Sequence, residues 1–169
     1  TSERIAEILK KHQLVYHFQP IVNSKNGQIY AYEALMRTTG EPRISPLAIL
    51  NYAGSANRLY EIEYLTYFNV LQYIRNHYSM FEGKRVFINS IPGHFLTESD
   101  YQQLCSEYGD ILSKLVVEFT EQAETEGEEL TMVQERCSEN HMEIAVDDYG
   151  TGYSNITNLL RYSPNYVKI

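Results

Sequence analysis

Apolar and polar positions along the chain change period repeatedly, and this change predicts alternating strands and helices. Apolar runs of strand length predict strands at residues 15–22, 28–37, 85–91, 114–120, 142–148 and 165–169. Stretches with helical spacing predict helices at residues 46–79 (with a break), 98–108, 127–140 and 153–161. The regular rhythm after residue 85 indicates one α/β domain over residues 1–169.

The connections between these segments predict how the strands are arranged. The loop at 23–27 is short and contains Gly27, which favours an antiparallel pair for the first two strands. The later strands alternate with helices, which implies a mainly parallel sheet, either open and doubly wound or closed as a barrel. A closed eight-stranded barrel typically needs on the order of 250 residues. With about six strands, a barrel in this chain is expected to be incomplete.

Acidic and amide side chains fall at or near the carboxyl ends of four successive predicted strands. They are Glu33, Asn89, Glu118 and the pair Asp147 and Asp148. In parallel strand-helix folds this edge of the sheet binds ligands. Clustered carboxylates need a compensating charge, and oxygen-only ligands favour Mg²⁺ or Mn²⁺. Two adjacent aspartates can reach two ions, which suits in-line attack on a phosphodiester.

Each of these residues also has an ordinary structural interpretation, which the spacing alone leaves open. Glu33 can pair with Arg37 on the same strand face. Asn89 can be a turn residue, and Asp147 with Asp148 can cap the turn that follows them.

Composition and charge exclude some classes of function. The chain has 14 Lys and Arg against 22 Asp and Glu, a formal net charge of -8. We therefore expect no binding to long nucleic acid. No stretch approaches the roughly 20 apolar residues of a membrane span, so we expect a cytoplasmic domain without membrane contact. Cys105 and Cys137 lie far apart and predict two free thiols rather than a disulfide scaffold.

Six short motifs in order give the chain a family resemblance. They are FQPIV at 18–22, YEALMR at 32–37, FIN at 87–89, VEFTE at 117–121, DDYGTGYS at 147–154 and YVKI at 166–169. The set resembles the EAL domain family of cyclic di-GMP phosphodiesterases. The resemblance covers essentially the whole chain, which is similar to the N-terminal portion of a single EAL domain without its last strands and helices.

The resemblance implies a fold and an activity. The fold is a variant TIM-type (β/α)8 barrel whose first strand runs antiparallel to its neighbours. The activity is metal-dependent hydrolysis of cyclic di-GMP to linear pGpG in bacterial signalling, with two Mg²⁺ or Mn²⁺ ions. The metal ligands implied are Glu33, Asn89, Glu118, Asp147 and Asp148.

The resemblance also assigns roles to residues around the metals. Gln19, Leu35 and Arg37 would contact the dinucleotide. Lys168 would lie beside the attacking water or the scissile phosphate, where a cation offsets developing charge. Glu121 would brace the loop from Asp148 to Ser154, which shapes the metal site and the dimer contact.

Two other functions remain open at this point: a receptor that binds cyclic di-GMP without cleaving it, and a dimerisation module. The resemblance implies a homodimer, and sensory or GGDEF-type domains elsewhere in a parent protein that can be membrane-anchored. We expect these 169 residues alone to be inactive, and either unstable or associated with another copy, because an open barrel edge exposes unpaired backbone groups.

Overall fold

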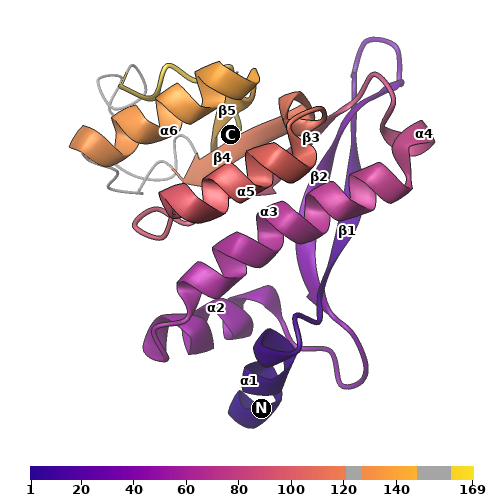
Figure 1. The fold of residues 1–169 in the computed structure, drawn as a ribbon. Helices are drawn as coiled ribbons and strands as arrows, with labels where there is room; N and C mark the ends of the chain where they lie inside the picture. Colours follow the sequence, from indigo (N-terminus) through magenta and orange to yellow (C-terminus); the bar gives the residue numbers. More distant parts are fainter. Residues whose placement is uncertain (121–126, 148–160) are drawn as a thin grey trace.

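A six-stranded sheet forms the centre of the fold (Figure 1). The computed structural model describes residues 1–120, 127–147 and 161–169. The strands lie in the sheet in sequence order: β1 (Leu14–Val22), β2 (Ile29–Thr38), β3 (Arg85–Asn89), β4 (Leu115–Thr120), β5 (Glu143–Asp147) and β6 (Tyr166–Val167). This order is that of a sheet that curls toward a barrel, which the described strands do not close.

The sheet begins with the predicted antiparallel pair. β1 and β2 run in opposite directions, with Leu14 opposite Thr38 and Gln19 opposite Glu33. Their loop is closed by the Asn23 amide, which donates to the Gln28 carbonyl at 2.8 Å. From β2 to β6 every pairing is parallel, as the strand-helix alternation predicts.

The helices follow the predicted positions, with one addition. They are α1 (Ser2–Lys10), α2 (Pro46–Ser55), α3 (Leu59–Asn76), α4 (Tyr78–Phe81), α5 (Glu98–Tyr108) and α6 (Gly127–Asn140), with a short 3₁₀ turn at Leu112–Lys114. α5 and α6 have the predicted bounds, and the stretch 46–79 divides into three helices. The helix predicted at 153–161 falls almost entirely outside the described residues.

Capping residues explain where two helices begin. Ser45 accepts a hydrogen bond from the Ala48 amide, and Pro46 follows it at the first helical position of α2. Thr97 caps α5 in the same way through the Asp100 amide. Both starts are therefore encoded locally, which is why the sequence predicts them well.

Helices cover one face of the sheet, here called the outer face. Figure 1 shows α3, α5 and α6 side by side across it. Strand side chains such as Val86, Val117 and Val146 point outward and pack with Leu71 of α3 and Leu104 of α5. Burying these apolar faces against each other is the main favourable term in forming the layer.

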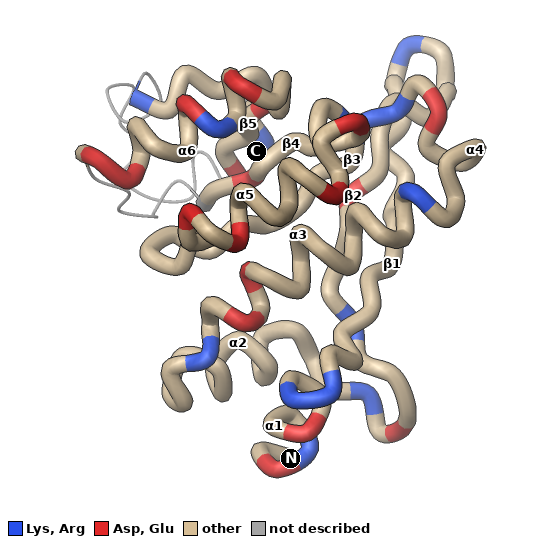
Figure 2. The backbone as a smooth tube through the Cα atoms, in the orientation of Figure 1, with Lys and Arg blue, Asp and Glu red and all other residues tan. Residues whose placement is uncertain are grey.

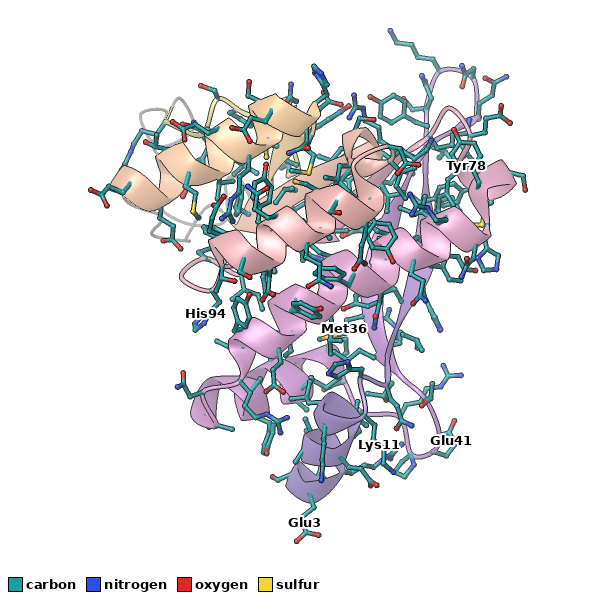
Figure 3. All side chains as sticks on the ribbon, in the orientation of Figure 1. Glu3, Lys11, Met36, Glu41, Tyr78 and His94 are labelled. Carbon is teal, nitrogen blue, oxygen red and sulfur yellow. The ribbon has the colours of Figure 1, made fainter. Side chains whose placement is uncertain are left out.

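The N-terminal helix, which the sequence analysis did not predict, packs at one end of this layer. Ile5 and Leu9 of α1 join Ile49 of α2 and Ile62 of α3 in a separate apolar cluster. Met36 of β2 packs against this cluster and lies among the three helices (Figure 3). The apolar positions 5, 8 and 9 have helical spacing, which was the available signal for α1.

The opposite side of the sheet, here called the inner face, carries a small apolar layer. Ala31, Phe87, Val116 and Ala145 are buried there, one from each of four neighbouring strands, with Ile21 and Tyr166 packed against them. The Phe87 and Tyr166 rings meet edge to face with centroids 5.1 Å apart. These side chains form one apolar layer across the inner face of β2 to β5.

Charged residues are spread over the helices and loops rather than gathered on one element (Figure 2). Among the described residues, no helix has the length and hydropathy that crossing a bilayer requires.

Candidate functional site

Five polar side chains emerge from the inner face level with the carboxyl ends of β3 and β5, although β2 itself continues past Glu33 to Thr38. Each comes two positions after an apolar residue of the inner face, and strand residues two apart point to the same side. The pairs are Ala31 and Glu33, Phe87 and Asn89, Val116 and Glu118, Ala145 and Asp147, and Tyr166 and Lys168. The two-residue spacing therefore puts these residues on one face of the sheet, at the edge where the sequence analysis expected a ligand to bind.

Lys168 is the centre of this group. Its Nζ lies 3.0 Å from Oε1 of Glu118, 3.2 Å from Oε1 of Glu33 and 3.8 Å from Oδ2 of Asp147. The Lys168 amide also donates to the Val146 carbonyl at 2.9 Å, which extends the pairing of β5 and β6 by one residue. One ammonium group thus faces three carboxylates from three different strands.

Glu118 is the most enclosed of the carboxylates, being 1% exposed. Burial raises the pKa of Glu118 to about 7, and the negative charges of Glu33 and Asp147 add to the increase. The Lys168 ammonium acts in the opposite direction but does not cancel the effect. The second carboxylate oxygen, Oε2, is buried without a hydrogen-bond partner, so it retains capacity for another cation.

Lys168 responds to the same charges. Burial alone lowers the pKa of a lysine, but the carboxylates of Glu118 and Glu33 outweigh that effect, so the pKa of Lys168 is raised. The side chain therefore carries its positive charge throughout the neutral range.

Asn89 and Glu118 are direct neighbours across β3 and β4. Asn89 is exposed, and together with Glu118 it lines a cavity of about 300 Å³ at the carboxyl edge of the sheet. Pro46 and Leu50 of α2 form part of the opposite wall. Cavities from about 300 Å³ upward are typical of small-molecule sites.

The residues assigned to the dinucleotide lie on the same side of the sheet. Leu35 and Arg37 line the cavity with Asn89. Gln19 is exposed on β1 directly opposite Glu33. The Arg37 guanidinium donates to the Met36 carbonyl at 2.7 Å, whereas the ion-pair partner of Glu33 is Lys168. The alternative pairing of Glu33 with Arg37 is therefore not the arrangement observed.

The donor set suits a hard divalent cation in its chemistry. Glu33, Asn89, Glu118 and Asp147 offer oxygen ligands, and the unpartnered Oε2 of Glu118 is a position that a cation would satisfy. Within the described ranges, however, no three His, Cys, Asp or Glu side chains are arranged to hold an ion by themselves. In this arrangement Lys168 supplies the compensating charge.

Several predicted site residues cannot be placed. Glu121, Asp148 and the loop to Ser154 lie outside the described residues. Their expected roles in bracing the loop, holding a second ion and forming a dimer contact stay predictions.

Sequence reasoning missed one polar group beside the site. Glu63 of α3 is buried and contacts the residues that directly follow Asn89. The available signal was a glutamate between Ile62 and Leu65 on the buried face of a helix, where a charged residue is unusual.

Comparison with known proteins identifies the family. The sequence matches the EAL domain family over residues 2–169. The chain belongs to the EAL family. It is 28% identical over 180 residues to the Escherichia coli K12 protein named "Probable cyclic di-GMP phosphodiesterase PdeN", covering 99% of this chain and 34% of that protein. It is 25% identical over 171 residues to the E. coli K12 "Cyclic di-GMP phosphodiesterase PdeR", covering 98% of this chain and 26% of that protein.

The EAL fold is also found in solved structures that are similar to this one. The PaMucR phosphodiesterase in its c-di-GMP complex superposes with a TM-score of 0.81 at 24% identity, covering 99% of this chain and 70% of that one. The S helix-GGDEF-EAL structure of Vibrio cholerae LapD superposes with a TM-score of 0.82 at 16% identity. The match covers 99% of this chain and 41% of that one. The chain spans about a quarter to a third of the length of the curated relatives compared above.

Proposed function

We propose that this EAL domain acts in the metal-dependent hydrolysis of cyclic di-GMP to linear pGpG. The observation that carries the proposal is the convergence of Glu33, Glu118 and Asp147 beside a cavity at the carboxyl edge of the strands. The names of the curated relatives give the substrate class. Carboxylates gathered at this edge suit cation-assisted attack on a phosphodiester.

The proposed cations are two Mg²⁺ or Mn²⁺ ions. Glu33, Asn89, Glu118 and Asp147 would hold the first, and Asp147 with Asp148 would hold the second. Such ions, when bound, neutralise the carboxylates, polarise the phosphate and lower the pKa of a water molecule. The orphaned Oε2 of Glu118 supports a cation at this position.

The proposed reaction is a hydrolysis with a single bond exchange. The oxygen of a water molecule forms a bond to one phosphorus, and the bond from that phosphorus to a ribose 3′ oxygen breaks. The proton lost from the water balances the one gained by the departing 3′ oxygen. The product is a linear dinucleotide that retains a 5′ phosphate.

Side chains of this domain would bind and orient the substrate. Arg37 lines the cavity and has a planar fork that fits a phosphate oxygen pair, and Gln19 and Leu35 would contact the rest of the dinucleotide. Lys168 keeps its charge at the carboxyl edge, where it would offset negative charge as the phosphorus is attacked.

We propose that the domain works inside a longer cytoplasmic or membrane-anchored protein, as a homodimer with sensory or GGDEF-type partners. The V. cholerae LapD S helix-GGDEF-EAL structure, in which an EAL domain accompanies a GGDEF domain, supports the choice of partner.

A receptor that binds cyclic di-GMP without cleaving it is the second candidate. The observation in its favour is the Lys168 ammonium, which pairs with Glu33 and Glu118 and so balances their charge without a divalent ion. A receptor needs the cavity and Arg37 but no catalytic cation.

The test compares the full-length protein with its Glu33→Ala variant, using purified cyclic di-GMP with Mg²⁺ or Mn²⁺. Turnover to pGpG that requires the cation and is lost in the variant is the expected result. Binding of cyclic di-GMP without turnover by the unchanged protein overturns the enzyme and supports the receptor. If the unchanged protein neither binds nor cleaves cyclic di-GMP, both the enzyme and the receptor proposals are overturned.

A further inference from the structure

A buried carboxylate on α3 holds the turn that follows β3. Glu63 is 1% exposed, and each of its oxygens accepts one hydrogen bond. The Ser90 hydroxyl donates to Oε1 at 2.5 Å, and the Ile91 amide donates to Oε2 at 2.8 Å. These donors are the first two residues after Asn89, so the carboxylate fixes the chain at the point where it leaves the strand.

The remaining contacts of this turn complete its attachment. On the strand side, the Ser90 amide donates to the Glu118 carbonyl at 3.0 Å. Farther along, the Gly93 amide donates to Oε1 of Glu129 on α6 at 2.9 Å. Gly93 has a φ of +83°, a conformation that glycine adopts readily. The turn is thus tied to β4, α3 and α6, and the bond from Ser90 to Glu63 of α3 is buried.

We propose that Glu63 is a positioning residue for Asn89, holding the turn after β3 so that the Asn89 carboxamide faces the carboxylate site. The inference rests on the proposed function, because the direction of Asn89 matters when it is a cation ligand. Asn89 is exposed, so its neighbours pack little against it, and its direction depends on the backbone on either side. β4 holds that backbone on one side and Glu63 holds it on the other.

Packing alone does not explain a carboxyl group at position 63. Ile62, Leu65 and Thr66 are buried around it on α3, and an apolar side chain would fill the same space. An apolar side chain would leave the Ser90 hydroxyl and the Ile91 amide without their acceptors, and leaving donors in the interior unpaired is costly. Groups that orient metal ligands in this way typically change metal affinity about 10–100-fold when removed.

The test measures Mn²⁺ binding by calorimetry to the full-length protein without nucleotide. Glu63→Leu keeps the volume and removes both acceptors, and we expect its Mn²⁺ affinity to fall about 10–100-fold. Glu63→Gln keeps an acceptor for Ile91 and can donate to Ser90, so it should stay within about threefold of the unchanged protein.

The matched control is Lys114→Met. Lys114 also anchors backbone, donating to the Phe81 carbonyl at 2.8 Å, but it lies at the amino end of β4, away from the site. We expect this variant to bind Mn²⁺ as the unchanged protein does. A fall as large as that of Glu63→Leu would show a general loss of rigidity and overturn the positioning role.

The remaining outcomes are separable. If Glu63→Leu folds and binds Mn²⁺ as the unchanged protein does, the inference is wrong. If Glu63→Leu does not fold, Ser90→Ala is the deciding variant, because it removes only the hydrogen bond from the Ser90 hydroxyl to Glu63. We expect its Mn²⁺ affinity to fall several-fold, and an unchanged affinity overturns the inference. If the unchanged protein binds Mn²⁺ but does not cleave cyclic di-GMP, the proposed activity fails while these comparisons still hold. If it binds no Mn²⁺, both proposals fail.

Discussion

The ammonium nitrogen of Lys168 lies 3.0 Å from Oε1 of Glu118, although the two residues are 50 positions apart in the sequence. Lys168 directly follows β6, and Glu118 is in β4, so the lysine side chain reaches across β5. The same ammonium meets Glu33 of β2, on the far side of β3. The charge balance of the carboxyl edge therefore depends on one side chain that links both halves of the sheet.

Removing that charge should destabilise the metal-free protein. In Lys168→Met, Glu118 and Glu33 lose their shared partner while Glu118 stays buried. We expect the free energy of unfolding in urea at pH 8 to fall by about 2–3 kcal/mol, somewhat less than for a fully buried pair because Lys168 is partly exposed. Lys11→Met, which removes the exposed pair with Glu7, should leave the urea midpoint unchanged. Equal midpoints for both variants would contradict the prediction.

Arg37 should contribute chiefly to substrate binding. In Arg37→Lys the charge remains but the planar fork is lost, so we expect the KM for cyclic di-GMP to rise about tenfold with a smaller change in kcat. Steady-state kinetics of the full-length protein with Mn²⁺ measure both. Arg43→Lys, in the exposed loop beside Glu41, is the control and should change neither. A fall in kcat at unchanged KM would place Arg37 in the chemical step instead.

Stability should depend on pH through Glu63. Burial raises the pKa of Glu63 from 4.5 to about 8, although its hydrogen bonds to Ser90 and Ile91 oppose the shift. Between these two values the folded state binds more protons than the unfolded state, so stability falls as pH rises from about 4.5 to about 8. Above pH 8 the stability that protonation of Glu63 contributes is fully lost.

Glu63→Gln removes this titration. Its stability relative to the unchanged protein should therefore increase between pH 5 and pH 9, by on the order of a few kcal/mol. Thermal melts of both proteins across that range provide the measurement. Parallel curves would mean that Glu63 stays ionised when the protein folds.

The two thiols should differ strongly in reactivity. Cys105 is partly exposed and Cys137 is buried, and burial raises the pKa of the Cys137 thiol to about 12. We expect N-ethylmaleimide at pH 8 to modify Cys105 first and Cys137 only after urea unfolding. Mass spectrometry of the protein and of Cys105→Ser follows each site. Rapid labelling of native Cys105→Ser would show that α6 opens readily.

Local signals predicted much of this fold. Ser45 and Thr97 begin their helices by capping, and Gly27 marks the first hairpin, so these boundaries follow from a few neighbouring residues. α1 was missed because its apolar stripe is short and its burial depends on α2 and α3, which come later in the chain. β6 is shorter than predicted, since its ladder with β5 pairs only Tyr166 and Val167.

The site was predicted in its residue types but not in its contacts. Period-two spacing is enough to place Glu33, Asn89, Glu118 and Asp147 at one edge. The meeting of Lys168 with Glu33 depends on the register and twist of five strands, which no short segment encodes. The burial of Glu63 against the turn after β3 likewise depends on how α3 lies across the sheet.

The inner apolar layer limits the side of the sheet from which the candidate site can bind a ligand. Phe87, Val116 and their neighbours form an apolar layer two residues before the carboxylates along each strand, and Tyr166 packs against it. These apolar side chains cannot coordinate a cation or hydrogen-bond to a phosphate, so polar binding is confined to the carboxyl side of the layer. A dinucleotide would therefore be held from that side, where the cavity lined by Asn89 and Glu118 lies.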